Sequence, residues 1–538
     1  MPTVAEIFTL AYRHHQNGAY AQAEQLYSQV LQMDPGHADA HHLLGVLAYQ
    51  TGRFDQAIAS IHKALALTPT AAHYHSNLGL AYRALRQFDQ AVVCFREALT
   101  CDPQYADAHN GLGDVLRTQG RLDEAVRHCQ RALQISPDFA DAHNNLGNAL
   151  FLQGKADQAI VCYQEALRRR PNFALAHTNL GNAYRSRGRY DDALACVETA
   201  LRIEPELPLA RWNRSVLWLL RGDFERGWPE YEWRWTHYAH ARRQFAQPRW
   251  DGSPLHGRTI LLYAEQGLGD SFHFIRYVPL VRERGGKVIM ECPRPLRNVL
   301  AGCAGIDQLV ATGAELPSFD VQAALLSLPS IFRTTMATIP RTVPYLQANP
   351  ELVDQWRRDL AIILPLPASG RGIGGEGIFK IGITWQTDPS HQEHTRAMPL
   401  TQFAGLGRIP GVKLISLQKG PGTEQLADLG GAFEVMDLGA RLDEKAGAFM
   451  DTAAIMKNLD LVISCDTAIP HLAGALGVPV WIALPFVPEW RWLLHREDSP
   501  WYPTMRLFRQ TQLGRWDDVF ERMAAELQAQ LSVKSPNN

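Results

Sequence analysis

Glycine and proline recur every 34 residues through the first two-fifths of this 538-residue chain. The glycines are Gly45, Gly79, Gly113, Gly147 and Gly181, and the prolines are Pro35, Pro69, Pro103, Pro137, Pro171 and Pro205. Proline cannot continue an α-helix, and it disfavours the helical region for the residue before it. Each proline is therefore expected to end one helix and turn the chain into the next. A period of this length indicates helical hairpins stacked as a solenoid.

Small residues mark where the two helices of each unit must approach closely. They are Ala57, Ala91, Ala125, Ala159 and Ala193, and then Ala64, Ala98, Ala132, Ala166 and Ala200. The pattern seen from Asn77 to Ala91, and again from Asn179 to Ala193, resembles the tetratricopeptide repeat. The resemblance covers residues 1 to about 235, so we expect a repeat domain over 1–236.

Asparagine occupies one position of the repeat, which we call the Asn ladder. Its members are Asn77, Asn145, Asn179 and Asn213, with Gly111 as the exception. Amides can bond a peptide backbone regardless of its side chains. The ladder looks like the one in the repeats of O-GlcNAc transferases, which implies a protein or peptide on the concave face. The other interpretation is that each Asn caps or bridges adjacent helices, and both stay open.

Histidine forms a second ladder at the same interval. Its members are His41, His75, His109, His143 and His177. Stacked units separate these rings too far to share an ion at ligand distances of ~2 Å. We therefore expect them to pack between helices and predict no metal site here.

Composition limits the classes of partner and location. The net charge of −2 gives no general field for nucleic acid or an acidic membrane. The eight cysteines are scattered without a CxxC pair, as expected in a reducing compartment. The first residues are typical of an amphipathic repeat helix, and no apolar run approaches the ~20 residues of a membrane span. These features predict a cytoplasmic, multidomain protein.

The pattern changes after the repeats. A tryptophan-rich stretch, from Trp212 to Trp250, is interpreted as a capping unit that docks onto the region C-terminal to it. From Gly257 an apolar strand, a glycine turn, a helix and a β-branched strand form a βαβ unit, with a further strand at 308–311 and a helix over 350–360. The glycine-rich segment 364–378 predicts a linker between an N-terminal half, 237–363, and a C-terminal half, 379–538.

The C-terminal half alternates strands and helices. Strands are expected at 380–385, 413–417, 433–437, 459–464 and 480–484, and helices from Leu400, Thr423, Asp451 and His471. With the repeats before them, two such halves suggest an α solenoid followed by two Rossmann-like α/β domains that face a cleft. Parallel sheets place ligands at the carboxyl ends of their strands.

Two turns at such strand ends carry the candidate chemistry. In the first, Gly267 and Gly269 let backbone approach a ligand, and Asp270 either caps the following helix or acts chemically. In the second, residues 464–471 open a small-residue helix whose N-terminus can hold an anion. Asp466 and Thr467 there are caps or ligand contacts.

Two further loops after strands supply cations. Arg396 and Lys419 are candidates to neutralise a pyrophosphate, although a surface lysine is usually only solvated. Trp385 is a candidate to stack on a nucleotide base.

Taken together, the segments from Gly257 to about Arg515 resemble the heptosyltransferase-like glycosyltransferases of family 9, which have a GT-B fold. The resemblance rests on an early G-D turn followed by a proline, Asp270 and Pro279, and on a late turn. The late turn contains Asp466, Thr467, Ala468, His471 and Ala473. Ala468 stands where that family often has glycine, and Pro470 precedes the histidine, so the phosphate geometry differs. The tail 485–510 looks like a hallmark of bacterial repeat proteins that carry this domain.

This resemblance implies metal-independent, inverting transfer of a sugar from a nucleotide-diphosphate donor to a protein or surface-glycan acceptor. Asp270 is then the candidate base, with His273 in reserve. The donor is held by Gly267, Gly269, Trp385, Arg396, Lys419, Asp466, Thr467, Ala468 and His471. No D-x-D triplet occurs, so no metal cofactor is expected. The alternative is a non-catalytic repeat scaffold with an inactive or nucleotide-sensing α/β half.

Overall fold

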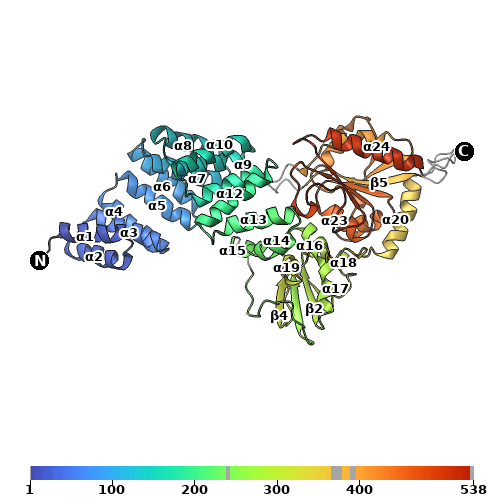
Figure 1. Ribbon diagram of the computed structural model, residues 1–538, viewed down its shortest axis with the longest axis horizontal. Coiled ribbons are helices and arrows are strands. Elements are labelled where there is room, and N and C mark those ends of the chain that lie inside the picture. The colour runs from blue at the N-terminus through green and yellow to red at the C-terminus, as the bar shows by residue number, and fades with distance from the viewer. Residues whose placement is uncertain (1, 238–242, 365–377, 388–395, 534–538) are drawn as a thin grey trace. The chain divides into compact units, whose positions relative to one another are not determined.

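The computed structural model describes residues 2–237, 243–364, 378–387 and 396–533. It divides into two compact units, Met1–Ala210 and Arg211–Asn538 (Figure 1). The predicted linker lies almost wholly outside the described residues. Helix α13, Pro208–Leu220, crosses the boundary between the units.

The first unit is a solenoid of helix pairs, as the 34-residue period predicts. The helices are α1 (Val4–Gln16), α2 (Tyr20–Met33), α3 (Ala38–Gln50), α4 (Phe54–Leu67), α5 (Ala72–Ala84), α6 (Phe88–Cys101), α7 (Ala106–Thr118), α8 (Leu122–Ile135), α9 (Ala140–Leu152), α10 (Ala156–Arg169), α11 (Ala174–Arg185) and α12 (Tyr190–Ile203). Each second helix ends two residues before the repeated proline, so the proline does punctuate the repeat.

The repeated glycine and alanines are fixed by close helix packing. A Cβ atom on Gly45 would lie 2.6 Å from Cγ1 of Ile61 and 3.0 Å from the carbonyl of Ala57. No real Cβ tolerates such contacts, so the close approach of the two helices at this point requires glycine. The predicted packing alanines, such as Ala57 and Ala125, have no exposed surface.

The histidine ladder has a role that was not predicted. In every member Nε2 lies 2.8–3.2 Å from the carbonyl oxygen of the repeated proline six residues earlier, as in His75 with Pro69. A carbonyl only accepts, so Nε2 carries the proton. Each ring thus bonds the turn before its own helix. The predicted packing between helices is seen for His109, whose ring centroid lies 5.3 Å from that of His128 on α8.

The tryptophan-rich segment belongs to the second unit. It contains the end of α13, α14 (Phe224–Tyr231) and α15 (Arg234–His237). The ring of Trp228 lies 5.2 Å from that of Trp490 and 6.4 Å from that of Trp501, centroid to centroid. The expected docking onto the C-terminal region is therefore confirmed for this segment.

The N-terminal half of the second unit holds a four-stranded parallel sheet in the order β3-β2-β1-β4. Its strands are β1 (Thr259–Tyr263), β2 (Lys287–Cys292), β3 (Gln308–Ala311) and β4 (Val321–Ala324). Its helices are α16 (Leu268–Phe274), α17 (Val278–Arg282), α18 (Arg297–Leu300) and α19 (Leu328–Ile331). Strand β4 was not predicted, because its Val-Gln-Ala-Ala sequence shows no alternation and little β-branching.

The C-terminal half holds a six-stranded parallel sheet in the order β10-β9-β8-β5-β6-β7. Its strands are β5 (Phe379–Thr384), β6 (Val412–Ser416), β7 (Val435–Met436), β8 (Leu461–Ser464), β9 (Val480–Leu484) and β10 (Met505–Arg509). Both halves thus have α/β character with parallel sheets. Edge strand β7 is shorter than predicted, and β10 was not predicted.

The helices of this half depart from expectation in two places. The segments expected to be helical from Leu400 and Thr423 are 3-10 turns, Leu400–Phe403 and Thr423–Leu429, the first followed by α21 (Ala404–Gly407). Glycines at 405, 407, 420, 422, 430 and 431 interrupt regular helix there.

Three longer or better-formed helices complete the half. They are α22 (Met450–Met456), α23 (Ala468–Ala475) and the unpredicted α24 (Asp517–Val533). Helix α20 (Pro350–Ile363) precedes the linker yet packs on α22, where Nε1 of Trp356 donates to Asp451 at 2.8 Å. Figure 1 shows α20 and α24 beside β5.

Candidate functional site

The first glycine turn links β1 to α16. Gly267 is the N-cap residue, and its N–H donates to Oδ2 of Asp270 at 2.9 Å. Asp270 therefore caps its helix, as the simpler interpretation held. Gln266 and Gly267 are exposed, so solvent reaches this turn.

The second turn links β8 to α23. Thr467 is the N-cap, and its hydroxyl accepts from the N–H of Ile469 at 3.3 Å. Ser464, at the end of β8, shares a 2.6 Å hydrogen bond with Thr384 at the end of β5. Both Ser464 and Asp466 are buried. The turn is thus fixed by side-chain bonds and presents the N-terminus of α23.

The two turns lie against each other, and Figure 1 shows α16 and α23 side by side. A Cβ on Gly269 would lie 3.0 Å from Cδ2 of His471 and 3.4 Å from Cα of Ala468. A side chain at 269 would therefore press on this contact. The turns after β1 and β8, one from each sheet, meet here.

Tyr502 joins the same two helices. Its hydroxyl lies 3.1 Å from Nδ1 of His273 and 3.0 Å from Nδ1 of His471. One hydroxyl has a single proton, so if both contacts are hydrogen bonds at least one histidine must donate to it. Burial, aided by nearby arginines, lowers the pKa of both histidines well below the usual value. His273 has no exposed surface, so it is a structural group here and not a reserve base.

Arg491 is the central cation of the site, and the sequence reasoning missed it. It is 7% exposed and donates to Asp270 across the contact and to Glu489 beside it. Its guanidinium lies 4.3 Å from the ring centroid of Trp490 and 5.2 Å from that of Phe274. Nε has no partner among the described residues although it is buried. Two residues on, Leu493 has φ 55° and ψ −171°, a region nearly restricted to glycine.

The two predicted cations, Arg396 and Lys419, lie in different surroundings. Nη1 of Arg396 lies 3.3 Å from Oδ2 of Asp466, so Arg396 belongs to the site. Nζ of Lys419 bonds Glu444 at 2.8 Å and the carbonyl of Leu442 at 3.0 Å, on an exposed surface. Lys419 thus bonds groups outside the two turns.

Trp385 is not available to a ligand. It has no exposed surface, lies in the hydrophobic core of the C-terminal half, and donates its Nε1–H to the carbonyl of Gly422 at 3.1 Å. The prediction that it stacks on a base is corrected accordingly. Its position after a strand suggested a ligand contact, but the ring points into the sheet packing.

The Asn ladder bridges neighbouring repeats. Nδ2 of Asn145 lies 2.9 Å from Oδ1 of Asn110, Nδ2 of Asn179 lies 2.9 Å from Oδ1 of Asn144, and Asn77 pairs with His42 at 2.8 Å. Each partner is 35 residues earlier, and Asn213 is buried. A side-chain amide has two N–H groups and an oxygen with two lone pairs, so a bridge donated by Nδ2 leaves capacity for a peptide.

Gly111 interrupts the ladder next to an aromatic ring. A Cβ at this position would lie 2.5 Å from the ring of Phe95. The residues at the equivalent position before Asn77 and Asn145 are Ile61 and Cys129, which are smaller, whereas Tyr163 precedes Asn179.

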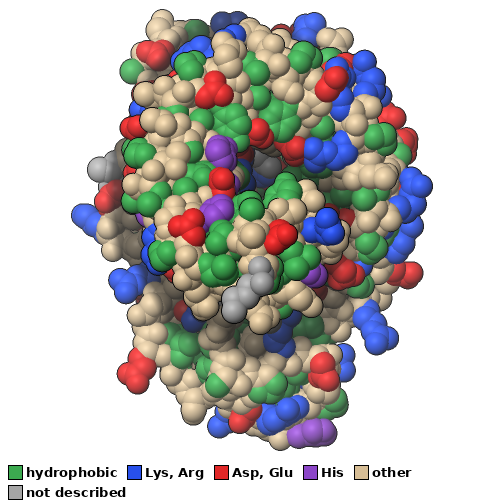
Figure 2. Space-filling model, turned by 90° about the vertical axis from the view of Figure 1, so that its left-hand side faces the viewer, with side chains coloured by type: hydrophobic (Ala, Val, Ile, Leu, Met, Phe, Trp, Pro, Cys, Tyr) green, Lys and Arg blue, Asp and Glu red, His purple; other side chains and the backbone are tan. Residues whose placement is uncertain are grey.

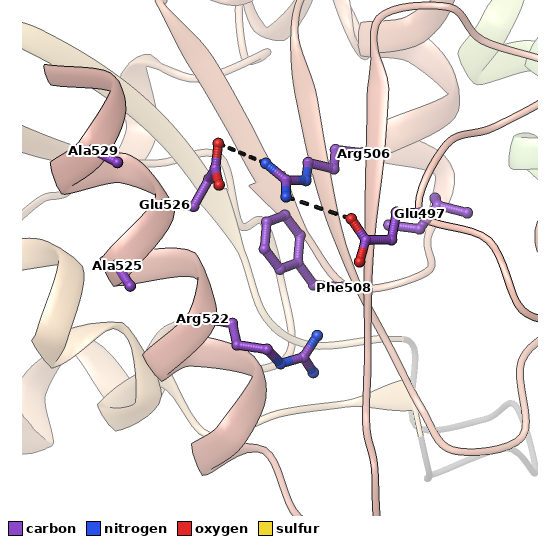
Figure 3. Close-up of a pocket in the computed structure, with 8 residues that line it drawn as sticks. Glu497, Arg506, Phe508, Arg522, Ala525, Glu526 and Ala529 are labelled. Carbon is purple, nitrogen blue, oxygen red and sulfur yellow. Dashed lines mark hydrogen bonds and ion pairs between the residues drawn. The ribbon is translucent and has the colours of Figure 1, made fainter. Parts of the chain in front are cut away.

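A cavity of about 330 Å³ lies between β10 and α24 (Figure 3). Arg506 at its centre is paired with Glu526 at 2.6 Å and Glu497 at 3.5 Å, over the ring of Phe508. Arg522 pairs with Asp518. Its lining includes none of the predicted site residues, and its charges are compensated internally.

Membrane spans and metal clusters are both absent from the described ranges. No helix there is long and apolar enough to cross a bilayer. No group of three or more His, Cys, Asp or Glu in that part of the chain is placed to hold a metal ion. On the face in Figure 2, acidic and basic side chains both occur, in line with the near-neutral charge.

Family comparisons identify the repeats. Models of the tetratricopeptide repeat match residues 14–79 and 174–207, and a model of the TPR repeat matches 79–120, 113–154 and 147–184. Residues 14–207 are therefore tetratricopeptide repeats, an architecture that presents a surface for protein partners.

One curated relative and several solved structures are similar to the chain. Protein FlbA of Caulobacter vibrioides is 30% identical over 340 residues, which cover 58% of this chain and 54% of that protein. The chain thus spans about half of that relative. Among solved structures, the APC/C hetero-tetramer Cut9-Hcn1 is 20% identical with a TM-score of 0.38, covering 40% of this chain and 42% of that one. MamA is 27% identical with a TM-score of 0.28, covering 31% and 96%.

Proposed function

We propose that the α/β region is a glycosyltransferase that moves a sugar from a nucleotide-diphosphate donor to an acceptor recruited by the repeats. The transfer is metal-independent and inverting. The observation that carries the proposal is the contact between the two turns, in which Gly269 lies against Ala468 and His471 and two arginines flank the N-terminus of α23. The sequence resemblance to family 9 and the paired parallel sheets support the same assignment.

The diphosphate of the donor would be held by Arg396, Arg491 and the N–H of Ala468 at the start of α23, since the N–H of Ile469 bonds Thr467 and Pro470 has none. As the bond from the anomeric carbon to the diphosphate oxygen breaks, the electron pair leaves with that oxygen. Fixed cations aimed at the developing charge lower the barrier, because they need no reorganisation during the step. Arg491 is suited to this role, since Phe274 and Trp490 hold its guanidinium in place.

Both arginines are paired with carboxylates, Arg396 with Asp466 and Arg491 with Asp270 and Glu489. A diphosphate carries more charge than one carboxylate and would compete for the same donors. The donor is thus expected to loosen the Arg491 contact with Asp270 when it binds.

The repeats supply the acceptor. Bridging by Nδ2 of Asn145 and Asn179 leaves one N–H of each amide for another partner, and these two residues lie 34 positions apart in the first unit. Such a row suits an extended polypeptide, so we favour a protein acceptor over a surface glycan.

Calorimetric titration with ADP, UDP, GDP and CMP sugars in the presence of EDTA tests the donor site. One nucleotide should bind, and Arg396→Ala and Arg491→Ala should each weaken it at least tenfold. Lys419→Ala is the matched control, because Lys419 is an exposed cation of the same half that bonds Glu444, and it should bind as the wild type does. Failure of every nucleotide to bind would favour the repeat scaffold instead.

A further inference from the structure

The hydroxyl of the buried Tyr502 lies among three polar side chains at the contact between the two turns. Its oxygen is 3.1 Å from Nδ1 of His273, 3.0 Å from Nδ1 of His471 and 3.3 Å from the hydroxyl oxygen of Tyr345. Both histidines are neutral, because burial holds the pKa of each ring well below its usual value. Each ring therefore carries one proton, and its position follows from the surrounding hydrogen bonds.

Tyr345 does not take the proton of Tyr502. The oxygen of Tyr345 accepts from Nη2 of Arg276 at 2.8 Å, and its own proton goes to the carbonyl of Phe272 at 2.9 Å, which can only accept. The 3.3 Å between the two hydroxyl oxygens exceeds the usual ~2.5–3.0 Å of an O–H···O bond. Tyr502 therefore donates to one of the two histidines.

His273 is the donor to Tyr502, and His471 is the acceptor. Nε2 of His273 is buried without a partner among the described residues. A buried N–H without an acceptor is disfavoured more than an unpaired lone pair. The proton of His273 therefore lies on Nδ1, where the oxygen of Tyr502 accepts it. Tyr502 then donates to Nδ1 of His471, so the proton of His471 lies on Nε2.

His471 presents this N–H at the start of α23. It lies in the first turn of the helix and is 5% exposed, whereas His273 has no exposed surface. Helical side chains lean toward the N-terminus of their helix, so the His471 ring covers the end that begins at Ala468. A Cβ on Gly269 would lie 3.0 Å from Cδ2, the ring atom next to Nε2, and 3.4 Å from Cα of Ala468. The ring edge that carries Nε2 and the first residue of α23 therefore border the same glycine.

We propose that Tyr502 is a positioning residue that holds His471 as the Nε2–H tautomer, and that this N–H donates to the diphosphate of the sugar donor. The proposal rests on the glycosyltransferase function proposed above. It supplies a hydrogen-bond donor beside Ala468, in a turn where Ile469 is already bonded and Pro470 has no N–H. His471 keeps its proton throughout the reaction, so it binds the leaving group and does not act as an acid.

Nitrogen NMR of protein with labelled histidine rings tests the tautomers without any sugar donor. Long-range proton–nitrogen spectra of the wild type should show an Nε2–H ring for His471 and an Nδ1–H ring for His273. The two rings are assigned from the signals that disappear in His471→Gln and His273→Gln. The opposite pattern, or an Nδ1–H ring at both positions, would overturn the proposal.

Calorimetry with the nucleotide sugar that binds in the panel above tests the contact with the diphosphate. His471→Ala should weaken binding by about tenfold or more, and Tyr502→Phe should weaken it by about threefold or more. His471→Gln keeps an N–H near the position of Nε2 that depends on no tautomer. Adding Tyr502→Phe to His471→Gln should therefore cause little further loss.

Tyr345→Phe is the matched control, because it removes a neighbouring hydroxyl that bonds neither histidine. It should bind the nucleotide sugar as the wild type does. Equal losses in Tyr345→Phe and Tyr502→Phe, or the same loss from Tyr502→Phe with His471 and with Gln at that position, would show that the hydroxyl only supports packing and would overturn the proposal. Absence of nucleotide binding by a wild type with the expected tautomers would instead refute the proposed function, and the diphosphate contact with it.

Discussion

The guanidinium of Arg491, in the C-terminal half, pairs with the carboxylate of Asp270 on α16 of the N-terminal half. The pair crosses the contact between the two sheets and is largely buried, with 9% and 19% of the two side chains exposed. Because the same guanidinium also bonds Glu489, one residue links the capped helix of one half to the loop after β9 of the other.

Asp270→Asn should destabilise the α/β region. The amide cannot balance the charge of Arg491, which stays buried with Glu489 as its remaining partner, so we expect a loss of roughly 1–3 kcal/mol in the free energy of unfolding. Urea unfolding measures it. Asp498→Asn, which removes the exposed partner of Arg496, should cost less than about 1 kcal/mol. Equal effects of the two variants would contradict this account.

The stability of the protein should fall between about pH 4.5 and about pH 7 through Glu265. Burial raises its folded pKa, so the folded state holds the proton more tightly than the unfolded chain. The stabilisation from the protonated Glu265 is complete below the pKa of the unfolded chain. It is lost as pH rises through the pKa of the folded state. A shift from 4.5 to about 7 corresponds to about 3 kcal/mol. Gln stays neutral at every pH, so thermal unfolding over this window should show the wild type losing stability relative to Glu265→Gln as pH rises.

Arg86→Gly should stabilise the repeats. Arg86 has φ 59°, at the turn position where Gly18, Gly52, Gly120 and Gly154 also have positive φ. Glycine adopts this conformation without steric cost, so the free energy of unfolding should increase by about 0.5–1 kcal/mol, which raises Tm. The reverse change, Gly120→Arg, should lower Tm. A lower Tm for Arg86→Gly would contradict the strain argument.

Gly111→Asn should damage the solenoid, although it would complete the Asn ladder. The new Cβ would lie 2.5 Å from the Phe95 ring, so we expect a loss of about 1–3 kcal/mol. Adding Phe95→Ile, the residue type found at Ile61 in the equivalent position, should recover part of it. Chemical denaturation of the single and double variants measures both free energies of unfolding. A Gly111→Asn variant as stable as the wild type would refute the expected clash with Phe95.

Much of the fold could be predicted from the sequence, because packing contacts that repeat along the chain require the same residue types at a fixed interval. The interval from Gly45 to Gly181 reflects helix contacts that repeat, and β9 follows from a β-branched run bounded by prolines. Strand β4 lacked such a signal. The bond of each histidine ring to a proline carbonyl was not predicted, because it leaves no mark in the sequence beyond the period itself.

The site was harder to predict than the fold. Gly269, Asp466 and His471 come together because parallel strands end at one edge, which topology dictates. Arg491, Glu489 and Tyr502 are brought in by an irregular loop, and only the density of arginine and aromatic residues in 485–510 hinted at them. Which cation is buried depends on packing, so Lys419 was chosen and Arg491 was missed.

Proton NMR of donor hydrolysis in EDTA tests the central claim most directly. The nucleotide sugar that binds should be converted by the wild type to nucleoside diphosphate and a free sugar whose anomeric configuration is first opposite to that of the donor. Arg491→Ala should slow this release, while Lys419→Ala should not. A donor that stays intact with the wild-type protein as it does in buffer, or a first product with retained configuration, would contradict the assignment of an inverting, metal-independent transferase.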